Sequence, residues 1–201
     1  MIAVLDYGIG NLRSAEKALQ KVGADARLVT GPAAVEAADG VVLPGVGAFG
    51  RCMEALRATG LDEAAMSAID AGTPFMGICI GMQMLYEGSE ENPAVRGLGV
   101  LSGHVRELPE GVKRPQMQWN VLQPVGASPL LAGLDKNTWV YFVHSYAPDA
   151  SDDVVATCDY GGSVVAAVAR RNVWATQFHP EKSGAAGLRI LKNFVDRCEP
   201  T

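Results

Sequence analysis

The stretch Gly77 to Gly81 (G-I-C-I-G) constrains the fold of this chain more than any other. It follows a short apolar run, Pro74 to Met76, and precedes a helix-like run, Met82 to Tyr86. A strand, a sharp turn and a helix in this order form a nucleophile elbow, here with Cys79 in place of Ser. The flanking glycines permit a strained turn, and the helix N-terminus favours a thiolate. A buried Cys in a Gly-flanked turn explains the motif equally well, so a catalytic interpretation needs a base elsewhere.

The pattern around this stretch predicts an α/β fold. In the first half, apolar runs at 2–5, 26–29, 41–43 and 74–76 alternate with helix-like segments at 12–22, 32–37 and 51–71. Strands and helices joined by short links favour a mostly parallel sheet with helices on both faces. The second half is rich in Gly and Pro. It predicts an antiparallel-looking set of strands at 119–122, 139–143, 154–158, 164–168 and 173–178, closed by a helix at 184–197.

Composition narrows the class of protein. The 201 residues predict one domain, and 48% hydrophobic with 19% charged residues is typical of a globular chain. A net charge of −5 argues against binding to nucleic acid or an anionic membrane. No apolar run reaches the roughly 18 residues of a spanning helix, and the N-terminus resembles a first strand. Four scattered cysteines, without C-x-x-C or zinc-like spacing, favour a reduced, cytoplasmic protein with no metal.

A second glycine-rich stretch, Pro44 to Gly50, follows a predicted strand and contains the letters G-x-G-x-x-G. This is the dinucleotide fingerprint, but its acidic partner belongs at the end of the next strand, whereas Asp70 lies before that strand. We therefore favour a different use, in which Gly45, Val46 and Gly47 bring a backbone N–H beside the Cys79 turn. There it would complete an oxyanion hole.

Of the three histidines, one is suited to serve as the base. His104 lies in a Gly-flanked loop and is interpreted as a surface residue, while His144 ends an apolar strand as a packed or wall-forming residue. His179 also ends a strand, and Glu181 follows it across a proline, close enough to orient the imidazole. Cys79, His179 and Glu181 then form a nucleophile–base–orienter triad. Zinc deaminases share H-x-E but need a later P-C-x-x-C, which this chain lacks.

Three motifs together, G-I-C-I-G-M-Q, P-G-V-G-A-F-G and Q-F-H-P-E-K-S, resemble those of class I, triad-type glutamine amidotransferases. The segments D-Y-G-I-G-N-L and Y-F-V-H-S-Y are similar to the glutaminase subunits of imidazole glycerol phosphate synthase, an enzyme of histidine biosynthesis. The resemblance runs from Ile2 to about Phe194. It implies a flavodoxin-like α/β sheet, mostly parallel with an antiparallel extension, and an enzyme without a cofactor.

The resemblance also implies roles for particular residues. Cys79 would attack the side-chain amide of glutamine, Ile80 and the Gly45–Gly47 loop would hold the oxyanion, and His179 would protonate the departing ammonia. The substrate would be bound by Gln83, His144, Ser145 and Tyr146. A cyclase subunit with a (β/α)8 barrel would dock over the site as a heterodimer, receive the ammonia, and make imidazole glycerol phosphate and aminoimidazole carboxamide ribotide. The residues at that docking face would be Asn11, Trp119, Tyr141 and Lys182.

The chain departs from the family where relatives usually show P-H-[MI]-G-W-N, because Gln116 replaces the His and Gln118 the Gly. A side chain in place of Gly suggests a different local turn near the partner interface. Three alternatives stay open. They are another class I glutaminase, such as the pyridoxal phosphate synthase or anthranilate synthase subunit, an inactive partner that keeps the fold, and a nucleotide-binding protein.

Overall fold

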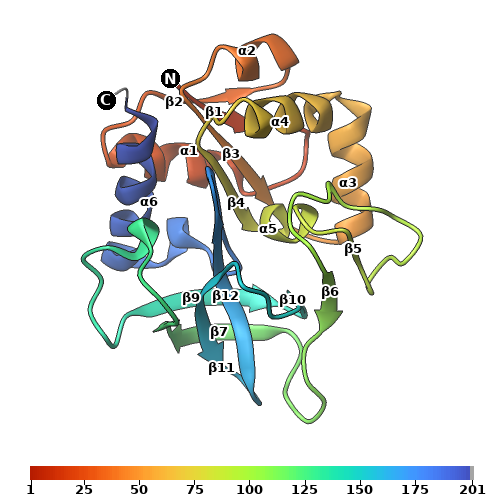
Figure 1. Cartoon of the computed structure of the whole chain (residues 1–201), viewed down its shortest axis with the longest axis vertical. Helices are drawn as coiled ribbons and strands as arrows, with labels where there is room; N and C mark the ends of the chain where they lie inside the picture. Colours follow the sequence, from red (N-terminus) through yellow and green to blue (C-terminus); the bar gives the residue numbers. More distant parts are fainter. Residues whose placement is uncertain (200–201) are drawn as a thin grey trace.

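A computed structural model describes residues 1–199, and within them eight strands form a mixed central sheet (Figure 1). Five strands are parallel and form one side of the sheet, whereas the last three pair antiparallel. In spatial order they are β2 (Ala26–Val29), β1 (Ile2–Leu5), β3 (Gly40–Gly45), β4 (Phe75–Cys79), β13 (Val173–Thr176), β12 (Ser163–Arg170), β11 (Val154–Asp159) and β8 (Gln123–Pro124). The predicted α/β class, mostly parallel with an antiparallel extension, is confirmed.

Helices cover both faces of this sheet (Figure 1). The long helix α6 packs against α1 on one side, and α2 packs against α4 while α3 packs against α4 and α5 on the other. The helices are α1 (Leu12–Lys21), α2 (Pro32–Glu36), α3 (Phe49–Ala58), α4 (Leu61–Asp70), α5 (Ile80–Met84) and α6 (Gly184–Cys198). Strands β1, β3, β4 and β13 are buried along their whole length, and their sequences are predominantly apolar, as is typical of parallel strands between two helical layers.

Two smaller sheets lie beside the central one. Strands β5 (Gly88–Ser89), β6 (His104–Glu107) and β10 (Tyr146–Pro148) form the first, and β7 (Gln116–Val121) pairs antiparallel with β9 (Trp139–His144) in the second. In Figure 1 the β7–β9 pair crosses below the carboxyl ends of β3 and β4. The backbone N–H of His179 donates to the Tyr141 carbonyl at 3.0 Å, which ties this pair to the central sheet.

Several sequence-based expectations need correction. The segment 51–71 forms two helices, because Gly60 adopts a left-handed conformation (φ 69°) and breaks the run between α3 and α4. The segment 173–178 is antiparallel to its neighbour β12, as expected, but its strand β13 ends at Thr176 and pairs parallel with β4 on its other edge. It therefore joins the parallel and antiparallel parts of the central sheet. His104 starts strand β6 and is not in a loop, although its side chain is exposed as expected.

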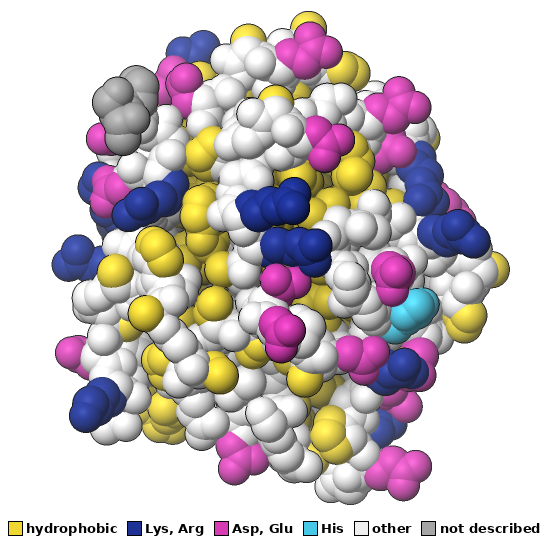
Figure 2. Space-filling view, viewed as in Figure 1, with side chains coloured by type: hydrophobic (Ala, Val, Ile, Leu, Met, Phe, Trp, Pro, Cys, Tyr) yellow, Lys and Arg dark blue, Asp and Glu magenta, His cyan; other side chains and the backbone are white. Residues whose placement is uncertain are grey.

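The segment with Gln118 also differs from the expectation. Residues of β7 pair one to one with β9 from Gln116 to Val121, so Gln118 causes no altered turn and its side chain lies exposed on a regular strand. On the face shown in Figure 2, cationic and anionic side chains are interspersed, in keeping with a chain of small net charge. No helix within residues 1–199 has the length and apolar character needed to cross a membrane.

Candidate active site

The elbow forms at the junction of β4 and α5. Cys79 is the last residue of β4 and caps the helix with φ 56° and ψ −111°, a strained backbone conformation for a residue with a side chain. A Cβ atom at Gly77 would lie 2.8 Å from the Gly81 carbonyl oxygen, and one at Gly81 would lie 1.8 Å from that of Leu43. The strand and helix can approach this closely only because both flanking residues are glycine.

His179 and Glu181 form a buried pair at the end of the segment that follows β13. His179 caps the short 3-10 helix η2 (Pro180–Lys182), and its Nδ1 lies 2.8 Å from Glu181 Oε1, with both side chains 2% exposed. Burial by itself lowers the pKa of the imidazole, but the adjacent Cys79 sulfur and Glu181 carboxylate outweigh it and raise the pKa to about 9. The Asn11 amide donates to the same Glu181 oxygen at 3.2 Å.

Cys79 and His179 line one cavity of about 240 Å³. His179 Nε2, the nitrogen remote from Glu181, is buried and has no hydrogen-bond partner among the described residues. Cys79 Sγ lies 3.9 Å from the Val143 carbonyl oxygen and 3.7 Å from the side-chain nitrogen of Gln177. A thiol, an imidazole and a carboxylate in this order are the groups of nucleophilic catalysis at an acyl carbon.

The cavity brings together most of the residues that the sequence suggested. Its lining consists of Val46, Gly47, Cys79, Ile80, Gln83, Glu91, Pro115, Val143, His144, Ser145, Tyr146 and His179. Of the expected oxyanion and substrate residues, only Gly45 is not part of this lining. A Cβ atom on Gly45 would lie 2.9 Å from the backbone nitrogen of Gly81, so Gly45 sits directly against the elbow.

The loop Gly45–Gly47 is fixed from behind by two buried side chains. The Tyr7 hydroxyl donates to the Pro44 carbonyl at 2.6 Å, and the Cys52 thiol donates to the Val46 carbonyl at 3.3 Å. Burial raises the pKa of both Tyr7 and Cys52, so both keep the proton that they donate. Because the C=O and N–H of a peptide point in opposite directions, the Gly47 N–H points away from Cys52.

Gln83 is buried in the first turns of α5 and is not the solvated helix residue that the sequence also allowed. Its NH₂ group donates to the Tyr146 carbonyl oxygen and to Gln177 Oε1, both at 3.0 Å. Its own oxygen, Oε1, is buried and lacks a hydrogen-bond donor in the part of the chain that the structure describes. Since Gln83 lines the cavity, this oxygen is available to a ligand there.

The opposite wall contains His144, which is buried and lines the cavity as expected. Its Nδ1 lies 2.8 Å from the Tyr146 carbonyl oxygen and its Nε2 lies 2.9 Å from the Gln116 amide. Burial lowers the pKa of His144 to about 4, so the ring is neutral at pH 7. A neutral ring that donates from Nδ1 must accept at Nε2.

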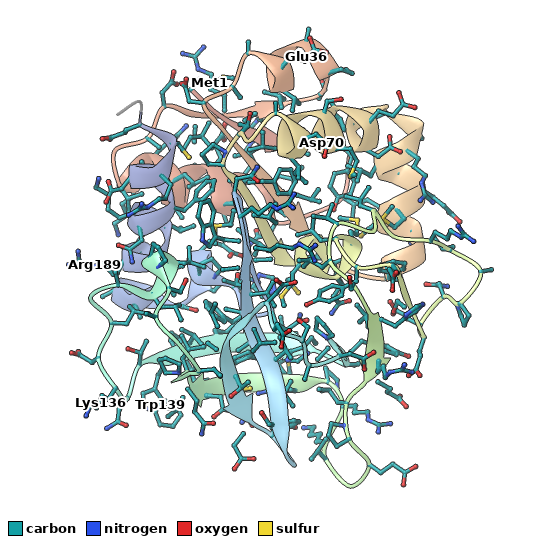
Figure 3. All side chains as sticks on the ribbon, in the orientation of Figure 1. Met1, Glu36, Asp70, Lys136, Trp139 and Arg189 are labelled. Atoms are coloured by element: carbon teal, nitrogen blue, oxygen red, sulfur yellow. The ribbon has the colours of Figure 1, made fainter. Side chains whose placement is uncertain are left out.

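The four residues expected at a docking face do not form one group. Trp119 is 47% exposed, and its ring packs edge-on against Tyr141 with centroids 6.1 Å apart. The Lys182 ammonium lies 6.0 Å from the centre of the Tyr141 ring. Asn11, by contrast, contacts the triad carboxylate. Two residues that the sequence did not suggest, Met117 (61% exposed) and Trp139 (54%), lie on the same β7–β9 pair and form an exposed apolar face with Trp119. Figure 3 shows Trp139 at the outer edge of the molecule.

Sequence reasoning missed several residues of the cavity and its surroundings. Glu91 lines the cavity and accepts a hydrogen bond from the Phe49 backbone N–H at 2.7 Å, and the acidic run 87–91 was the only hint of it. Gln177 stands in the Q-F-H-P-E motif but received no role. Within residues 1–199 no cluster of three or more His, Cys, Asp or Glu side chains is arranged to hold a metal ion.

Comparison with known proteins identifies the family to which the chain belongs. The family model described as glutamine amidotransferase class-I matches residues 3–198, and the chain belongs to this family. A PurLQS structure from Thermotoga maritima has the same fold, with a TM-score of 0.79 and 22% identity over 98% of each chain.

Closer relatives give the branch of the family. The chain is 51% identical to the imidazole glycerol phosphate synthase subunit HisH of Methanothermobacter thermautotrophicus, over 98% of each chain. It is 49% identical to the HisH subunit of Syntrophotalea carbinolica, over 98% of this chain and 100% of the relative. The chain therefore groups with the HisH subunits, the glutamine amidotransferase subunits of imidazole glycerol phosphate synthase, and the expected resemblance is confirmed.

Proposed function

We propose that this chain hydrolyses glutamine to glutamate and ammonia through a thioester on Cys79 and supplies the ammonia to a cyclase subunit in histidine biosynthesis. One observation carries the proposal: a thiol on a strained elbow, an imidazole paired with a carboxylate, and a free buried amide oxygen converge on one cavity. The high identity to HisH subunits supports the same reaction.

The reaction follows from the positions of these groups. The Cys79 thiolate attacks the side-chain amide carbon of glutamine. The new oxyanion accepts hydrogen bonds from the backbone N–H groups of Ile80 and the Gly45–Gly47 loop. His179, protonated and held at Nδ1 by Glu181, gives its Nε2 proton to the departing ammonia. A water molecule then attacks the thioester with His179 as base, which releases glutamate and restores the thiol.

Substrate glutamine needs groups that match its two ends. Glu91 is the carboxylate in the cavity lining and is partly buried, and a carboxylate is the partner that suits an α-ammonium group. Gln83 Oε1 has no donor within residues 1–199 and would accept an N–H from the substrate. The segment His144 to Tyr146 forms the opposite wall.

Ammonia released into water is protonated and loses its nucleophilicity, so an uncoupled glutaminase would waste its substrate. The exposed apolar face of Met117, Trp119 and Trp139 lies on the strand pair that also carries the cavity wall. Aromatic residues and Met are the side chains enriched at protein interfaces. A (β/α)8-barrel cyclase docked here, as a cytoplasmic heterodimer with this single-domain chain, would receive ammonia directly and form imidazole glycerol phosphate and aminoimidazole carboxamide ribotide.

The test is a comparison of two nitrogen sources in the complex with the cognate cyclase. Cys79→Ala should abolish synthesis with glutamine, by about 10³-fold or more, because the nucleophile is gone. Synthesis with an added ammonium salt should stay at the wild-type rate, since that reaction occurs in the cyclase. Retained glutamine-dependent synthesis, or loss of both activities, would contradict the proposal.

A second measurement tests the docking face. The chain alone should hydrolyse glutamine slowly and accelerate on addition of the cyclase. Trp119→Ala should weaken the complex about 10-fold or more, as loss of a central aromatic anchor does. Glu36→Ala, an exposed residue at the opposite end of the molecule from Trp139 in Figure 3, is the control and should leave the affinity unchanged. Equal affinity for both variants and wild type would place the cyclase elsewhere.

A further inference from the structure

Gln177 is fully buried on the segment between β13 and His179, and its side-chain nitrogen lies 3.7 Å from Cys79 Sγ. We propose that Gln177 donates an amide N–H to the Cys79 sulfur and thereby favours the thiolate over the thiol. The inference rests on the proposed role of Cys79 as nucleophile. It adds a neutral donor to the triad, in direct contact with the reacting atom.

The orientation of the Gln177 amide, that is, which end is oxygen and which is nitrogen, follows from the Tyr146 backbone carbonyl. Tyr146 O can only accept, so the Gln83 group that faces it at 3.0 Å must be the NH₂ end. The same NH₂ end lies 3.0 Å from the Gln177 amide, which must therefore present its oxygen to Gln83. The nitrogen of Gln177 is left facing Cys79. No other orientation of the two amides satisfies all three contacts.

The two polar neighbours of Cys79 Sγ act in opposite senses. The Val143 carbonyl at 3.9 Å can accept an S–H, so it favours the protonated thiol and repels a thiolate. The Gln177 N–H at 3.7 Å is a donor and favours the anion. Both Cys79 and Gln177 are buried, where a donor directed at an anion acts with little competition from water.

The Gln177 amide does not titrate, unlike several side chains around Cys79. The titratable side chains near the sulfur or on its cavity come from five segments of the chain: they are Tyr7, Cys52, Glu91, His144 with Tyr146, and His179 with Glu181. A change at Gln177 alters none of these groups covalently. A shift in the ionisation of Cys79 in a Gln177 variant therefore reports the loss of the amide donor.

The test measures the rate of Cys79 alkylation by iodoacetamide against pH in the full-length chain, with the modified peptide identified by mass spectrometry. Gln177→Met keeps the length of the side chain without the donor. It should shift the midpoint of the profile to higher pH and slow alkylation at neutral pH about 10-fold. Gln177→Glu adds a negative charge in place of the donor and should shift the midpoint further.

Thr176→Val is the matched control. It removes a buried side-chain hydrogen bond, from Thr176 to the Phe178 carbonyl at 3.0 Å, one residue before Gln177; within residues 1–199 the Thr176 hydroxyl makes no hydrogen bond to Cys79. Its alkylation profile should match that of wild type. An unshifted profile for Gln177→Met, or an equal shift for Thr176→Val, would overturn the proposal. Because alkylation needs neither glutamine nor the cyclase, this result is independent of whether the proposed glutaminase reaction is correct.

A second measurement needs no Gln177 variant. The glutamine residues of the wild-type chain are labelled with 15N and their side-chain amides are followed by NMR. The chemical shift of one side-chain amide should change with pH, with the same midpoint as Cys79 alkylation. The same signal should be constant with pH in Cys79→Ala. If no glutamine side-chain signal follows the ionisation of Cys79, the amide does not donate to the sulfur and the proposal is wrong.

Discussion

The two walls of the cavity are built in different ways. One consists of the carboxyl ends of β3, β4 and β13, where every strand residue is buried and the backbones of β3, β4 and α5 almost touch. The other is the β7–β9 pair, where buried Gln116 is followed at once by the exposed Met117. The first wall holds the nucleophile and its base on buried, closely packed backbone. The second places residues that shape the cavity next to a surface that a partner can reach.

This difference assigns catalysis to the first wall and contact with the partner subunit to the second. A change in the first wall should remove catalysis or the fold itself, because no part of it is free to relax. A change in the second wall should have smaller effects, which depend on whether the altered side chain faces the cavity or the apolar surface. The predictions below test this division, from the largest expected effect to the smallest.

The largest effect is expected for Glu181→Gln in the first wall. The carboxylate accepts a hydrogen bond from His179 Nδ1 at 2.8 Å, and an amide in its place cannot stabilise the imidazolium that forms during the reaction. We expect kcat/KM for glutamine in the complex to fall about 10³-fold, equivalent to ~4 kcal/mol. Ammonium-dependent synthesis is the internal control and should be unchanged. A loss below 10-fold would remove Glu181 from the triad.

The next largest effect is expected for Gly81→Ala. The added Cβ would lie 1.8 Å from the Leu43 carbonyl oxygen, so β3 or α5 would have to move. We expect a loss of about 3 kcal/mol or more in the free energy of unfolding. Gly126→Ala is the control, because a Cβ there meets nothing within 4 Å, and it should stay within about 0.5 kcal/mol of wild type. Equal stability of the two variants would show that the elbow can relax.

The first wall could be predicted from sequence because its information is local. Cys79 with its two glycines, and His179 with Glu181 two residues on, each occupy a single short segment, and each segment has one geometry that satisfies its backbone. The same locality explains why the strand at 173–178 was only partly predicted. Its antiparallel pairing with β12 follows from its sequence neighbours, whereas its parallel pairing with β4 joins distant segments and has no local signal.

The second wall was less predictable because its contacts join distant segments. Gln116 faces His144 only through the register of β7 on β9, and the spacing between them carries no motif. The first wall contains one contact of the same kind, since Gln83 and Gln177 are 94 residues apart and their shared hydrogen bond has no local sequence signal. Glu91 and Gln177 were therefore missed, and Gln116 was recognised only as a departure from the family pattern.

A smaller effect in the first wall depends on pH. The pKa of His179 is raised to about 9 in the folded chain, against about 6.5 when unfolded, so the folded state holds the proton more tightly. The resulting stabilisation is complete below about pH 6.5 and is lost as pH rises through 9. We measure the free energy of unfolding in urea for wild type and for His179→Ala. The stability difference between them should be about 2 kcal/mol larger at pH 6 than at pH 10.

The Cys79 sulfur is one cause of this raised pKa, which provides a control. In a Cys79→Ala background the same comparison of His179 with His179→Ala should show a smaller change between pH 6 and pH 10. An unchanged pH dependence in that background would mean that Cys79 and His179 do not interact in the folded chain.

The smallest effect is expected at Gln116 in the second wall. The neutral His144 donates from Nδ1 to the Tyr146 carbonyl, so its Nε2 must accept from the Gln116 amide 2.9 Å away. The structure places Gln116 Oε1 next to His144 and Gln116 Nε2 3.8 Å from the Cys158 sulfur. Since oxygen and nitrogen of an amide are assigned from their partners, we assign the flipped orientation, with the nitrogen towards His144. The oxygen then faces Cys158, whose pKa is raised by burial to about 11 and which has an S–H to donate.

Gln116→Met leaves His144 Nε2 buried without a donor and should cost about 1–2 kcal/mol in urea unfolding. Because His144 and Gln83 share the Tyr146 carbonyl, it should also raise KM for glutamine a few-fold with little change in kcat. Gln118→Met, two residues along the same strand but exposed, should change neither quantity measurably. Gln116 and Gln118 lie on the same face of β7 and differ in burial. If both variants behave alike, burial against His144 does not set the role of Gln116, and the contrast between the two walls fails at the point where the cavity and the docking face are closest.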